Sequence, residues 1–146
     1  MSWKNYQSKG LVAPHATSKA ELDDLRDAIK RNLDDASIDE LSEDNRFGIA
    51  YQAALLVAKM AIACAGYRVK GHGAHHTTFE VLPLALDSSF QKLANYLDRC
   101  RRKRNDISYD SQGVVSLADV EALVKQATQF AADVEAWIAK HHPTLA

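Results

Sequence analysis

Apolar residues recur every three or four positions along most of the chain, which is the spacing of one buried face of an α-helix. The clearest stretch steps through Leu117, Val120, Val124, Ala127, Ala131, Val134 and Ile138. Together the patterns predict helices over residues 18–35, 43–66, 78–86, 88–104 and 116–140. No alternating strand pattern and no Asn-Gly or Asp-Gly hairpin turn is visible. We therefore predict an all-α fold, a four- to five-helix, mostly antiparallel bundle.

Capping residues support several of these boundaries. Ser18 and Glu21 have the spacing of a capping box, and so do Thr77 and Glu80. Gly66 is suited to end the second helix, because glycine readily takes the left-handed conformation that follows many helices.

The second predicted helix is apolar nearly all round, so we expect it to be central and covered on most sides. It carries a stripe of small side chains, interpreted as a tight core contact: Ala54, Ala58, Ala61 and Ala65. Lys59 is the lone charge in its apolar part. Its side chain is expected to reach the surface; pairing with a carboxylate or lining a cleft are the alternatives.

The 146 residues fit one domain, 1–146, with residues 1–17 as an irregular N-terminal segment. A formal net charge of -1 argues against binding of nucleic acid through overall charge, but allows a local basic patch. Cys64 and Cys100 lie in apolar helical stretches, so we expect buried free thiols. We find neither an apolar run of about 18 residues nor a signal-peptide core. These features predict a cytoplasmic protein without membrane association.

The most distinctive stretch runs from Arg99 to Asp110, with the sequence RCRRKRNDISYD, and five of its first six residues are basic. If the helix ends here, these cations complement its macrodipole, which is an ordinary structural role. Alternatively, arginine side chains match phosphate oxygens with a planar fork of donors. The candidate ligand-binding residues are then Arg101, Arg102, Lys103 and Asp110. Asp106 and Asp110 could also orient Arg104 or cap the approach to the last helix.

The dipeptide Arg104-Asn105, followed by Ile107 and Tyr109, resembles the signature of the HEPN domain family. That signature is an arginine, usually followed by a polar residue, with a histidine four to six positions beyond. The helix order over residues 20–140 is similar to that family as well. The resemblance implies a homodimer in which two motif copies face each other across a cleft. Many members are metal-independent ribonucleases that cut single-stranded RNA, some are toxins beside a nucleotidyltransferase-type antitoxin, and others are non-catalytic binding modules.

The chain departs from the family signature at one position. In active members the arginine steadies phosphate charge and the histidine handles the proton of the ribose 2′-hydroxyl. Here Tyr109 stands at the fifth residue after Arg104, and no histidine lies between Arg104 and His141. A free tyrosine titrates near pH 10, so it is a poor base at neutral pH. We assign Arg104, Asn105 and Tyr109 to the site, and expect a non-catalytic or weakly active module that binds RNA or a nucleotide.

Two alternatives stay open. One is a metal-independent endoribonuclease that uses Arg104 with Tyr109, or with His72, His75 or His76 folded back towards Arg104. The other is a purely protein-binding partner, such as one half of a toxin–antitoxin or defence pair. The three histidines lie in a glycine-rich stretch far from both cysteines, which we interpret as a solvated, flexible loop. Neither a metal nor a cofactor is expected.

Overall fold

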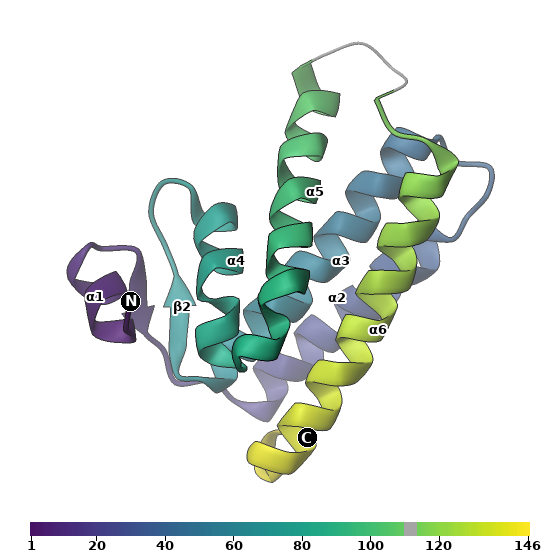
Figure 1. Cartoon of the computed structure of the whole chain (residues 1–146). Coiled ribbons are helices and arrows are strands. Elements are labelled where there is room, and N and C mark those ends of the chain that lie inside the picture. Colours follow the sequence, from purple (N-terminus) through teal and green to yellow (C-terminus); the bar gives the residue numbers. More distant parts are fainter. Residues whose placement is uncertain (110–113) are drawn as a thin grey trace.

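The computed structural model describes residues 1–109 and 114–146. Within these residues the α-helices are α1 (Trp3–Ser8), α2 (Lys19–Ala36), α3 (Glu43–Cys64), α4 (Ala74–Ala85), α5 (Gln91–Tyr109) and α6 (Leu117–His141). Two short 3-10 segments, η1 (Ser88–Phe90) and η2 (Pro143–Leu145), precede α5 and follow α6. The predicted all-α bundle is confirmed. The long helices alternate in direction, as Figure 1 shows for α5 and α6 in front of α2 and α3.

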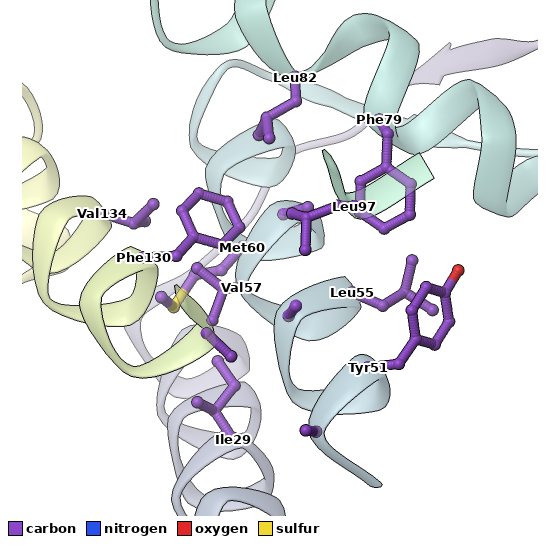
Figure 2. Close-up of a cluster of buried hydrophobic side chains, with 14 of the residues drawn as sticks. Ile29, Tyr51, Leu55, Val57, Met60, Phe79, Leu82, Leu97, Phe130 and Val134 are labelled. Carbon is purple, nitrogen blue, oxygen red and sulfur yellow. The ribbon is translucent and has the colours of Figure 1, made fainter. Parts of the chain in front are cut away.

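Helix α3 is the centre of the bundle, because α2, α4, α5 and α6 all pack against it. The small side chains Ala54, Ala58 and Ala61 are fully buried, which confirms a tight core contact. In Figure 2, Ile29 of α2 and Leu97 of α5 belong to the cluster of buried side chains that packs around α3. A helix covered on most sides needs apolar residues nearly all round, and α3 has them.

The apolar length of α3 corrects one expectation. Its 18-residue window has a mean hydropathy of 1.6, so by length and composition alone the helix could cross a membrane. From the sequence we expected no apolar run of that length. However, 72% of that window is buried inside the fold, as in the core helix of a soluble bundle. The hydropathy of α3 therefore reflects burial by its neighbours.

The helix caps are as predicted only in part. The hydroxyl of Ser18 accepts a hydrogen bond from the Glu21 amide at 3.1 Å. The reciprocal half of that capping box is absent, since the Glu21 carboxylate instead binds His15 at 2.7 Å and Thr17 at 2.8 Å. After α3 the chain turns at Gly66, whose φ of 94° lies in the left-handed region.

The N-terminal segment is more ordered than predicted. Residues 1–17 contain α1 and the strand β1 (Val12–Pro14), which pairs antiparallel with β2 (Tyr67–Val69). Each strand is only three residues long, so neither displays an alternating pattern that could be recognised in the sequence. Behind this sheet lies a second small core: Tyr6, Val12, Ile62, Val81 and Ala85.

The histidine-rich stretch is also not the loop that was predicted. Helix α4 begins at Ala74, so His75 and His76 stand in its first turn. Thr77 is buried within the helix and does not cap it; the N-cap position is Gly73, which makes no side-chain cap. The predicted start at residue 78 was wrong, because a helix without a side-chain cap leaves no capping signal in the sequence.

Helix α5 continues past the basic run to Tyr109, whereas the sequence predicted an end at residue 104. The cations therefore lie inside the helix, and the macrodipole interpretation was wrong. Asp106 lies within the same helix, so it does not cap α6; Ser116 does, in a reciprocal box with Asp119.

Both cysteines are buried and free, as expected. Burial raises the pKa of the Cys64 and Cys100 thiols to about 11. Neither thiol is therefore a reactive thiolate at neutral pH.

Candidate functional site

The side chain of Arg104 is held against the core helix. Its guanidinium carbon lies 5.3 Å from the centroid of the Tyr51 ring on α3, which is within the range of a cation–π contact. Tyr51 is itself fully buried, and Figure 2 shows it at one edge of the core. Burial raises the pKa of the Tyr51 hydroxyl, although the nearby Arg104 and Arg101 charges oppose that rise. Tyr51 thus stays protonated and offers Arg104 a fixed aromatic surface.

A histidine also contacts the same tyrosine. The Tyr51 hydroxyl oxygen is 3.2 Å from Nδ1 of His75, in the first turn of α4. Burial lowers the pKa of His75, and the positive charges of Lys59, Arg104 and Arg101 lower it further. The imidazole is therefore neutral at neutral pH and can accept a proton. Tyr51 therefore contacts both Arg104 and His75, a histidine that precedes Arg104 in the chain.

Asp98 organises the positive charges one turn earlier on α5. Its carboxylate accepts hydrogen bonds from Arg101 Nε at 2.7 Å and from Arg102 Nη1 at 2.9 Å. It also lies 3.1 Å from Nδ1 of His76 on α4. Burial would raise the pKa of Asp98, but the hydrogen bonds from Arg101 and His76 outweigh it and hold the pKa below its usual range. Asp98 therefore remains ionised and fixes Arg101 in place.

The structure separates the predicted ligand-binding cluster into two parts. Arg101 and Arg104, one turn apart, both act electrostatically on Tyr51 and His75. Lys103 instead pairs with Asp119 at the start of α6, with 2.9 Å between Nζ and Oδ2. Asn105 is an exposed residue of α5.

Two other predicted site residues are Tyr109 and Asp110. Tyr109 is the last residue of α5. Asp110 lies outside the described residues.

Arg104 also borders an open hollow of about 380 Å³ between α2, α3 and α5. Polar groups from α2 and α3 line much of it, including Asn32, Asn45 and Gln52. A ligand could therefore reach Arg104 from solvent without any opening of the core.

Sequence reasoning missed Tyr51 and Asp98. Tyr51 belongs to the apolar stripe of α3, so its periodicity indicates only burial. Asp98 precedes Arg101 and Arg102 by three and four residues, a spacing that does predict ion pairs on one helix face. His72, by contrast, is exposed in the turn before α4. Among residues 1–109 and 114–146, no group of three or more metal-ligating side chains could hold a metal ion.

Comparison with protein-family models assigns most of the chain to a known domain family. A family model for a HEPN-like domain matches residues 37–135, about two thirds of the chain, from the residue after α2 through most of α6. Neither a curated protein nor a solved structure matches the chain. The matched region contains α3, α4 and α5, which carry Tyr51, His75 and Arg104. The chain belongs to the HEPN domain family.

Proposed function

We propose that this HEPN domain binds single-stranded RNA, with Arg104 and Arg101 contacting backbone phosphates. The observation that carries the proposal is the position of Arg104, 5.3 Å over the ring of a fully buried tyrosine. An arginine that is already held in place loses less side-chain entropy when its planar fork of donors meets a phosphate.

The local charge supports the same role. The chain as a whole is close to neutral, so attraction to a polyanion has to come from a patch. Residues 99–104 supply five cations on two turns of one helix, and Asp98 is the carboxylate that pairs with two of them. Binding through these cations would be weakened by salt, because each phosphate contact releases counterions.

A second candidate, the endoribonuclease, is favoured by the contact between His75 and Tyr51. Because Nδ1 of His75 faces the Tyr51 hydroxyl, Nε2 is the nitrogen left to take the proton of a ribose 2′-hydroxyl. The 2′-oxygen would then attack the adjacent phosphorus, and the 5′-oxygen would leave with a proton from water, giving a 2′,3′-cyclic phosphate. Arg104 would stabilise the negative charge that develops on the phosphoryl oxygens.

Binding is tested by fluorescence anisotropy with an end-labelled, mixed-sequence single-stranded RNA in chelator. The Arg104→Ala variant should bind about tenfold more weakly, the scale of one charge-assisted contact. Arg31→Ala is the matched control, because Arg31 is an exposed arginine on α2 that does not line the hollow beside Arg104. Equal affinity of wild type and Arg104→Ala would overturn the binding proposal.

Cleavage is tested on the same samples by gel electrophoresis. If His75 is the base, His75→Gln abolishes cleavage but keeps RNA binding, whereas Tyr109→Phe still cleaves. Loss of cleavage in Tyr109→Phe alone would assign the base to Tyr109 instead. Intact RNA with the wild-type protein would rule out the enzyme and leave the binding proposal standing.

We further propose that the domain works as a homodimer, as membership of the family implies. Sedimentation equilibrium should then give a mass of twice the 16.1 kDa of one chain. A single-chain mass at micromolar concentration would contradict this.

A further inference from the structure

A second cavity, of about 350 Å³, is lined in part by His75, the histidine whose Nδ1 faces the Tyr51 hydroxyl. It forms where β2 and the start of α2 meet α3 and α4, and its apolar wall includes Leu25, Ile62 and Val69. Its size falls at the lower end of the range for small-molecule sites. The two arginines proposed to contact RNA phosphates, Arg101 and Arg104, do not line this cavity, although His75 does.

The cavity also carries cations. Lys59, the lone charge in the apolar part of α3, lines it, and so does Arg68 of β2. Within the described part of the chain, neither of these side chains forms an ion pair, in contrast to Arg101, Arg102 and Lys103.

One carboxylate lines the same cavity, but it is already engaged. Glu21 binds His15 at 2.7 Å and Thr17 at 2.8 Å, and these hydrogen bonds lower the pKa of Glu21. With Lys59 and Arg68 positive and Glu21 negative, the lining favours one added negative charge. Lys59 and His75 line the same cavity, and the positive charge of Lys59 helps to lower the pKa of His75.

We propose that this cavity binds a small aliphatic carboxylate, with its carboxylate against Lys59 and Arg68 and its chain against Leu25, Ile62 and Val69. A monoanion matches the charge of the lining, and an aliphatic chain matches the branched side chains of its wall. The proposal does not rest on RNA binding, because it concerns a different set of side chains.

The fold supplies an optical reporter for this site. Tyr67 lines the cavity, and the ring of Trp3 stacks on it with 4.3 Å between centroids and 5° between planes. The chain has two tryptophans, so Trp137→Phe leaves Trp3 as the single fluorescent indole. A ligand that shifts Tyr67 should change the emission of Trp3.

The experiment is a titration of the full chain with octanoate, followed by Trp3 fluorescence in the Trp137→Phe background and by amide chemical shifts. Octanoate should bind at least about tenfold more tightly than 1-octanol, since only the acid meets the two cations. Chemical-shift changes should cluster at β2, at the first turn of α4 and around Lys59. No octanoate binding at millimolar concentration, equal binding of the alcohol, or shifts confined to other elements would each overturn the proposal.

Variants sharpen the test. Lys59→Met keeps the apolar stem and removes the charge, so octanoate affinity should fall about tenfold. Lys125→Met is the matched control, because Lys125 is an exposed lysine on α6. Both lysines are exposed, so both variants should fold. An unchanged affinity in Lys59→Met would exclude Lys59 as the carboxylate partner and with it the proposed site.

Discussion

His76 and Asp98 connect α4 to α5, with 3.1 Å between Nδ1 of the imidazole and Oδ1 of the carboxylate. The same carboxylate holds Arg101, so one acidic side chain ties together the first turn of α4 and the cationic face of α5. Asp98 therefore sets the positions of His76 and Arg101 relative to each other.

Asp98 should make stability depend on acid. Its pKa is lower in the folded than in the unfolded chain, so its stabilising effect is present above the unfolded value, about pH 4, and is lost as pH falls through the folded value. We expect Asp98→Asn to lose less stability than wild type between about pH 5 and 2. Urea unfolding of both proteins across this range measures the difference. Parallel pH profiles would mean that Asp98 contributes no such linkage.

His75 should titrate below the ordinary value for histidine, near 6.5. Because the unfolded chain takes up this proton first, the contribution of His75 to stability is full above about pH 6.5 and is lost as pH falls through its folded pKa. Lys59→Met should raise the folded pKa by removing one opposing charge. Heteronuclear NMR of the imidazole carbons measures both values. A His75 that titrates at or above 6.5 in the wild type would contradict its burial beside these cations.

Leu97→Ala should cost about 2–5 kcal/mol, because Leu97 is fully buried between α3, α4 and α5 and the change leaves a cavity. Leu117→Ala is the matched control, since that leucine is 49% exposed at the start of α6 and its loss should change stability by at most about 0.5 kcal/mol. Chemical denaturation gives both values. Equal effects at the two positions would mean that the buried face of α5 is misassigned.

Arg104 and Arg26 should behave differently when replaced by alanine. Arg104→Ala should lower stability by at most about 1 kcal/mol, the size of a partly exposed cation–π contact. Arg26 instead binds both carboxylate oxygens of Glu135, at 2.8 and 3.0 Å, and the Leu145 carbonyl at 2.8 Å. Its loss should cost about 1–3 kcal/mol. Thermal unfolding compares the two, and a larger loss at Arg104 would make that residue mainly structural.

The sequence predicts the long elements of this fold well, because each buries one face over many turns. Helices α2, α3 and α6 begin and end within two residues of their predicted bounds. The prediction fails where order depends on contacts between distant segments. The pairing of β1 with β2 spans only three residues on each strand, and α4 begins without a side-chain cap. Neither feature leaves a recognisable pattern in the neighbouring sequence.

The candidate site shows the same division. Arg104 is recognisable from its neighbours in the chain, but the histidine beside it comes from another helix. His75 precedes Arg104 by 29 positions, and both side chains contact Tyr51. A motif written along one helix cannot contain such a residue, so the sequence alone could not bring His75 to the vicinity of Arg104.

The packing of α2 determines which part of the chain is needed for a stable core. The matched region begins at residue 37, after α2 has ended, yet Leu22 and Ile29 of α2 fill the core against α3. A fragment cut at the family boundary would leave one side of the most apolar helix open to water and would lose the Arg26 anchor for the C-terminal turn. The segment of this chain that matches the family is thus smaller than the unit that packs around α3. This chain trimmed to residues 37–135 would expose the apolar face of α3 that α2 covers and would be prone to aggregate.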